Sequence, residues 1–197
     1  MLNRIYLLCS ILFLLVFVSC GDDDVPEAEN EEEVINEVTL SFMPAGGGQT
    51  LVFNYVDPDG EGTEPAVKDD ISLEANTIYT LNVSFKNTVG ESDENLTQEI
   101  QDEGAEHQIF YGWTGSLFTN PKGLGNIGVD NKDSDMNYLD KDANGLPIGL
   151  QALWETDAAR TGTFRLLLKH QPGLKTATSS SVDGETDVDI TWNINIK

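Results

Sequence analysis

The chain has 197 residues, of which 11 are lysine or arginine and 34 are aspartate or glutamate, and its formal net charge at pH 7 is −23. A surface of this sign repels the phosphates of nucleic acids and of anionic lipid head groups, which argues against both as partners. The same field attracts cations and keeps the protein soluble.

The first 19 residues have the pattern of a secretory signal. Arg4 precedes an apolar run from Ile5 to Val18, which is shorter than the stretch of about 20 residues that a membrane-spanning helix needs. The run ends in Phe17-Val18-Ser19-Cys20, which resembles a bacterial lipoprotein signal, although an aliphatic residue is usual in place of phenylalanine. We therefore expect residues 1–19 to be removed and Cys20 to carry acyl chains. The alternative is an ordinary cleaved signal.

The cysteine content is consistent with lipid attachment. Cys9 and Cys20 are the two cysteines of the chain, and Cys9 lies in the segment that we expect to be removed. The mature protein then has no disulfide, and a lipid on Cys20 explains why one cysteine persists in an oxidising compartment. Several acyl chains anchor stably, because each buried methylene contributes about 0.8 kcal/mol.

Residues 20–35 form an acidic segment behind the lipidated cysteine. Between residues 22 and 33 there are eight acidic residues and no basic one, so self-repulsion and low apolar content predict a disordered tether. A flexible coil of this length would hold the next domain on the order of 20 Å from the lipid. The segment resembles the acidic export tags of some Gram-negative lipoproteins. It favours the outer membrane and the cell surface, with the periplasmic face as the alternative.

Residues 36–197 are expected to form one domain built of strands. Apolar and polar residues alternate in many short runs, which is typical of strands that bury one face. Strands are predicted at 38–42, 50–56, 79–85, 107–113, 148–154, 163–170 and 188–196. One short helix is expected within 95–105. The pattern favours an all-β fold, namely an antiparallel β-sandwich of Ig-like or jelly-roll-like connectivity.

Glutamates near the short helix and two histidines offer ligands for a transition metal. Glu99, Glu103 and Glu106 lead up to His107, and His170 ends a predicted strand. Zn²⁺ takes three or four such ligands. Each histidine also shares its strand face with apolar residues, so the alternative is that both are structural side chains at the border of the core.

An acidic loop at residues 140–145 has the spacing of a Ca²⁺-binding turn. The sequence Asp-Lys-Asp-Ala-Asn-Gly places oxygen side chains at positions 1, 3 and 5 and glycine at position 6. Gln151 stands where such a loop should have a bidentate glutamate. The expected ligands are Asp140, Asp142, Asn144, Asp133 and Asp135. The alternative is a turn stabilised by its own side chains, and the similar segment 57–62 is interpreted as a hairpin turn.

The sequence does not support an enzyme. No Gly-x-Ser-x-Gly motif is present, and Ser116 has no histidine near it in the sequence. Trp113 and Trp154 would form a sugar-stacking platform if they faced outward, but aromatic residues on alternating apolar faces are more often core. We therefore expect a non-catalytic protein.

Several stretches resemble a group of small, poorly characterised bacterial lipoproteins, which are sometimes labelled type 1 periplasmic-binding-fold proteins and accompany TonB-dependent outer-membrane receptors. These stretches are 140–150, 161–163, 168–172 and 184–187. The resemblance implies a role in the capture of a nutrient or metal. The fold label conflicts with the residues, because a two-lobed α/β protein needs about 300 residues and alternating helices and strands.

The sequence thus leads to two hypotheses from different classes. The first is a lipid-anchored binding lipoprotein of the outer membrane that serves a TonB-dependent receptor. The second, which depends on the loop at 140–145, is a Ca²⁺-stabilised structural or adhesive surface module.

Overall fold

Two β-sheets packed face to face form the domain in the computed structural model, which describes residues 34–60, 62–89, 92–128 and 136–197. The larger sheet has the order β3 (Val67–Lys68), β2 (Leu51–Val56), β1 (Glu37–Pro44), β5 (Ile78–Lys86), β8 (Gln151–Thr156) and β7 (Phe118–Asn120). The smaller sheet has the order β4 (Ile71–Leu73), β10 (Glu185–Ile196), β9 (Arg160–His170) and β6 (His107–Trp113). Neighbouring strands are antiparallel except β4 and β10, which are parallel. The expected antiparallel β-sandwich is confirmed.

Alternation along the strands fills the space between the sheets. In β10, for example, every second residue from Val188 to Ile196 is buried, and the residues between them are exposed. The inward side chains include a group of large aromatic residues packed mostly edge to face, a favourable arrangement for aromatic rings. The group contains Phe42, Tyr79, Tyr111, Trp113, Phe118, Trp154 and Phe164. Because Trp113 and Trp154 lie in this core, the sugar-platform interpretation is wrong.

Most predicted strands agree with the structure to within a few residues, but that at 148–154 is displaced and three short strands were not predicted. β8 begins only at Gln151. Before it, the carboxylate of Asp140 accepts the backbone N–H groups of Gly149 and Leu150 at 3.1 and 2.8 Å, and Ile148 pairs with β6 instead. β3, β4 and β7 have only two or three residues each, which is too short for a periodic pattern to appear.

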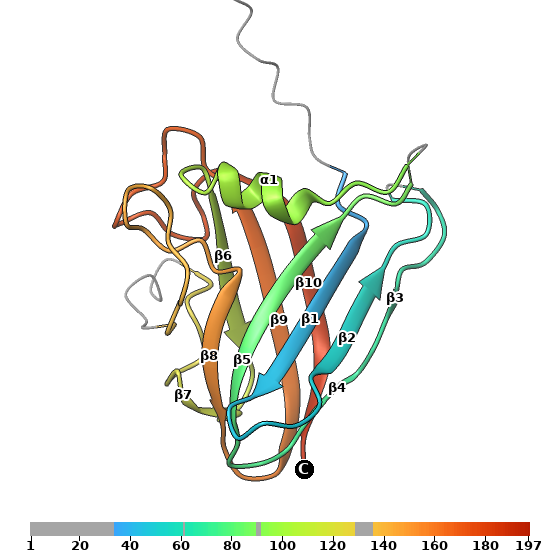
Figure 1. Ribbon diagram of the computed structural model, residues 1–197, viewed down its shortest axis with the longest axis vertical. Coiled ribbons are helices and arrows are strands. Elements are labelled where there is room, and N and C mark those ends of the chain that lie inside the picture. The colour runs from blue at the N-terminus through green and yellow to red at the C-terminus, as the bar shows by residue number, and fades with distance from the viewer. Residues whose placement is uncertain (1–33, 61, 90–91, 129–135) are drawn as a thin grey trace, which may run out of the picture. The chain divides into compact units, whose positions relative to one another are not determined.

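The short helix α1 (Leu96–Asp102) lies across one end of the sandwich (Figure 1). It begins at Asn95, whose side chain accepts the backbone N–H of Thr97 at 3.2 Å and so caps the helix. Leu96 and Ile100, four residues apart, are both buried in the core. The chain enters the described domain near the same end, whereas the C-terminus lies at the opposite end (Figure 1).

The open edge of β6 is covered by the long segment between β7 and β8. The N–H of Ile109 donates to the carbonyl of Ile148 at 2.7 Å, and the N–H of Tyr111 donates to the side chain of Asn126 at 2.9 Å. Gly125 has φ +100°, and a Cβ there would lie 2.0 Å from the carbonyl oxygen of Tyr111. Only glycine permits this close approach. All seven residues of β6 are therefore buried. His107, the first of them, is held in place by the contacts on both edges of this strand.

Candidate functional site

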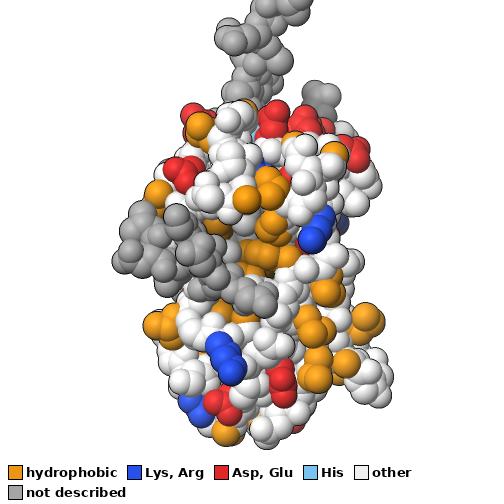
Figure 2. All heavy atoms as spheres, turned by 90° about the vertical axis from the view of Figure 1, so that its left-hand side faces the viewer, with side chains coloured by type: hydrophobic (Ala, Val, Ile, Leu, Met, Phe, Trp, Pro, Cys, Tyr) orange, Lys and Arg blue, Asp and Glu red, His pale blue; other side chains and the backbone are white. Residues whose placement is uncertain are grey.

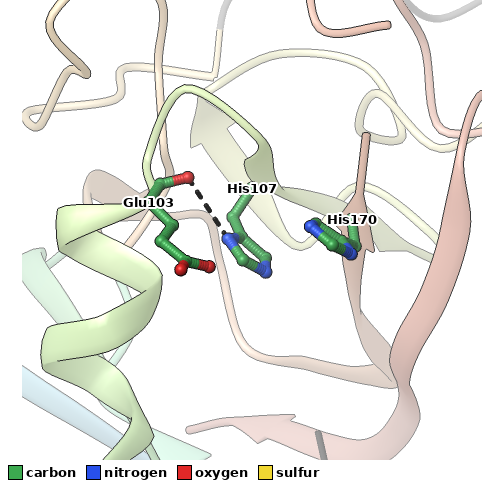
Figure 3. A group of neighbouring side chains, drawn as sticks. All are labelled: Glu103, His107 and His170. Carbon is green, nitrogen blue, oxygen red and sulfur yellow. Dashed lines mark hydrogen bonds between the residues drawn. The ribbon is translucent and has the colours of Figure 1, made fainter. Parts of the chain in front are cut away.

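The two histidines meet at the α1 end of the sandwich. His107 is the first residue of β6, His170 is the last residue of β9, and the register of the two strands makes them direct partners. Their rings stack with centroids 4.5 Å apart and planes inclined by 11° (Figure 3). Only 2% of His107 and 9% of His170 is exposed. The sequence placed both on core faces, and the structure adds that they touch.

The end of α1 brings glutamates to this pair. The chain turns sharply after α1, and Glu103, its C-cap residue, accepts a hydrogen bond from Nδ1 of His107 on its backbone carbonyl at 3.3 Å (Figure 3). Because a carbonyl can only accept, Nδ1 carries the proton of the neutral ring and Nε2 is unprotonated. Glu106 approaches the other histidine, with its Oε2 lying 3.3 Å from Nε2 of His170.

Burial and the neighbouring ring keep His107 neutral. Desolvation, followed by repulsion from His170, lowers the pKa of His107 to about 4. The carbonyl of Glu103 and the charge of Glu106 act in the opposite direction but are outweighed. At neutral pH the side chain is therefore an uncharged imidazole, the protonation state that binds metals.

Three of the five side chains considered as transition-metal ligands come together. One ligand atom each from Glu103, His107 and His170 lies within 4.8 Å of the other two. Glu106 is joined to the group through His170. Glu99, one turn earlier on α1, is exposed and does not belong to the group. Within the described parts of the chain, this group offers two nitrogen donors and a carboxylate.

A buried lysine, which no sequence pattern indicated, stabilises the turn that leads from α1 to His107. The Nζ of Lys175 lies 3.0 Å from Oδ2 of Asp142, and both side chains are fully buried. Nζ also donates to the backbone carbonyls of Gly104 and His107, at 2.5 and 2.8 Å. The ammonium thus faces three oxygens, two through hydrogen bonds and one through the ion pair. Desolvation lowers the pKa of Lys175 even though Asp142 opposes the shift.

The predicted Ca²⁺ loop is occupied by internal contacts. Oδ1 of Asp142 accepts the N–H groups of Asn144 and Leu146, both within 2.9 Å, and Oδ2 faces Lys175. The carboxylate of Asp140 accepts three backbone N–H groups, from residues 149, 150 and 151. A Ca²⁺ ion would have to replace these partners, and Asn144 is exposed. Asp133 and Asp135 lie outside the described residues, so the Ca²⁺ site stays a prediction.

The second acidic loop has the contacts of a tight turn. Oδ2 of Asp59 accepts the N–H groups of Thr63 and Glu64 at 2.7 and 2.9 Å. These bonds lower the pKa of Asp59, with that of Glu64 making the largest contribution. The side chain thus stabilises its own loop after β2, as expected for a turn residue.

Comparison with protein-family models, with curated proteins and with solved structures found no significant match. In the part of the chain that the structure describes, no helix is long and apolar enough to cross a membrane. Cys20 and the acidic residues between 22 and 33, predicted to carry the lipid and to form most of the tether, lie outside the described residues.

Proposed function

We propose that the protein is a non-catalytic, lipid-anchored binding lipoprotein of the outer membrane, exposed at the cell surface, which serves the TonB-dependent uptake of a nutrient or metal. The observation that carries the proposal is the sequence around Cys20, where a short apolar run ends in Ser19-Cys20 and an acidic segment follows. A lipid anchor and a tether would keep the folded domain at the membrane, where it can bind a partner.

The position of the histidine–glutamate group supports this proposal. The group lies at the end of the sandwich that carries α1, and the described chain enters the domain near that end (Figure 1). The segment that follows Cys20 therefore joins the domain at the same end as the group. Acidic side chains are also visible at this end of the domain (Figure 2), where they favour the approach of cations.

The contacts of the histidines support a binding role over catalysis. A histidine that activates a nucleophile hydrogen-bonds to a hydroxyl or thiol. Here His107 pairs with the carbonyl of Glu103 and His170 with the carboxylate of Glu106. These partners orient the rings and do not offer a group to be activated.

Replacing Cys20 tests the anchor. We expect Cys20→Ala to move the protein from the membrane fraction to the soluble fraction, because the sulfur that carries the lipid is lost while the rest of the chain is unchanged. Fractionation followed by immunoblotting measures the effect, and the membrane-bound share should fall at least about tenfold. Cys9→Ala is the matched control and should leave the protein at the membrane. Membrane association that persists in Cys20→Ala would overturn the lipid anchor.

The partner is tested separately by cross-linking in intact cells, followed by purification of the protein from detergent-solubilised outer membranes. We expect a TonB-dependent receptor to co-purify with the wild-type protein and to be lost with Cys20→Ala. Recovery of the protein without any receptor, under conditions that preserve other membrane complexes, would argue against the uptake role.

A further inference from the structure

We infer that Glu103, His107 and His170 form a binding site for a divalent transition-metal ion of the Zn²⁺ class. The inference deepens the proposed function and rests on it for the biological use of the ion. The site itself follows from the geometry of the domain, in which one ligand atom of each residue lies within 4.8 Å of the others. The three residues come from the end of α1, the start of β6 and the end of β9.

The hydrogen bonds around the rings are those found around metal-binding histidines. Such a histidine donates one ring N–H to a carbonyl or carboxylate, and the other nitrogen binds the metal. His107 donates from Nδ1 to the carbonyl of Glu103, which leaves Nε2 as the ligand atom. In His170 it is Nε2 that faces the carboxylate of Glu106, which leaves Nδ1 unprotonated in the neutral ring. Each histidine therefore has an oriented ring and one nitrogen available as a ligand.

The donor set selects the class of metal. Two imidazoles with one carboxylate suit Zn²⁺ and its neighbours in the transition series, whereas Ca²⁺ and Mg²⁺ prefer oxygen ligands alone. Three protein ligands leave a fourth position open. That open position suits an ion that is to be handed on, because an incoming ligand can attach before the protein releases the metal.

The charged side chains around the three ligands favour the binding of a cation. Glu103 and Glu106 face the histidines from the turn after α1. Lys175, which donates to the backbone carbonyl of His107, is paired with Asp142. Lys169, which directly precedes His170, donates to the hydroxyl of Thr186. The charge of Lys175 is thus largely compensated by Asp142, and the carboxylates of Glu103 and Glu106 remain to neutralise the metal.

The stacked rings imply a movement on binding. A ring nitrogen binds a metal in the plane of its ring, and two rings inclined by only 11° with centroids 4.5 Å apart share no such plane. His107 is held by the carbonyl of Glu103 and is almost fully buried. The ring that turns is therefore His170, whose partner Glu106 has a side chain that is 46% exposed and can follow it. Binding of the ion replaces the stack.

A metal titration tests the site. The full chain is purified from membranes in detergent, treated with a chelator, and titrated with Zn²⁺ alone by calorimetry, with the visible absorption of Co²⁺ as a second readout of the ligand set. We expect one ion per chain. His107→Gln and His170→Gln should each weaken binding at least about 100-fold, and Glu106→Gln, which removes an orienting partner, about tenfold. Ca²⁺ should not compete.

Two further variants keep the test decisive. Glu103→Gln changes an exposed side chain, so it should fold normally and still weaken binding, even if a buried histidine variant does not fold. Glu99→Gln, an exposed change one turn away on the same helix, is the matched control and should bind as the wild type does. Absence of saturable Zn²⁺ binding, or binding that His170→Gln and Glu103→Gln leave unchanged, would overturn the site. Neither result bears on the lipid anchor, which Cys20→Ala tests by itself.

Discussion

Lys175→Met should lower the free energy of unfolding by about 3–5 kcal/mol, the cost of removing one partner of a buried ion pair. Methionine has a similar length but no charge, so the carboxylate of Asp142 would stay buried without its cation. The carbonyls of Gly104 and His107 would also lose their donor. Urea unfolding of the wild type and the variant, followed by circular dichroism, measures the difference.

Two other variants separate the ion pair from a general effect of losing a lysine. Lys141→Met removes an exposed lysine next to Asp142, and we expect its effect to stay within about 0.5 kcal/mol. In the double variant Lys175→Met with Asp142→Asn, the buried charge is gone, while the amide oxygen still accepts the N–H groups of the loop. It should recover a large part of the lost stability. A loss below about 1 kcal/mol for Lys175→Met alone would contradict this account of the lysine.

Acid should destabilise the metal-free protein through His107, by up to about 3 kcal/mol between pH 6.5 and pH 4. The pKa of His107 is lowered to about 4 in the folded protein, chiefly by burial, from an ordinary value of 6.5. Between pH 6.5 and pH 4, His107 is therefore mostly protonated in the unfolded chain and mostly neutral in the folded protein. The free energy of unfolding is therefore not reduced by this protonation above pH 6.5, and it decreases progressively as the pH falls from 6.5 towards 4.

The measurement compares urea unfolding of the wild type and of His107→Gln at several pH values from 4 to 7, in the presence of a chelator. Glutamine does not titrate, so the variant should lose less stability over this window, and the difference between the two curves isolates the histidine from carboxylates that titrate nearby. His170, Glu103, Glu106 and Lys175 remain in both proteins and form a common background. Parallel curves would show that burial of His107 has no energetic consequence.

The strands that could be predicted are those in which the sequence of the strand itself shows which face is buried. In β5 and β10 apolar residues alternate with polar ones, and alternation by itself decides which face is buried. The start of β8 could not be predicted, because the backbone of Gly149 and Leu150 is bound by Asp140 from an earlier loop. A residue outside the strand thus determined where the strand begins.

The loop at residues 140–145 shows a similar limit for a short motif. Oxygen side chains at alternate positions of the loop follow from the sequence, and in the structure Asp142 does bind a positive charge. The charge belongs to Lys175, which the fold brings in from a distant loop. The spacing of a motif describes which atoms converge, whereas the identity of the cation depends on what else is packed there.

By itself, the sequence determined the class of fold, the core faces of both histidines and the pattern that ends in Cys20, because each of these follows from neighbouring residues. The meeting of His107 and His170 was decided only by the tertiary structure, since it depends on β6 lying next to β9 in one particular register. Strand order and register are set by the packing of the whole sandwich. The sequence could therefore name both histidines as candidate ligands, but it carried no local signal that the two lie side by side.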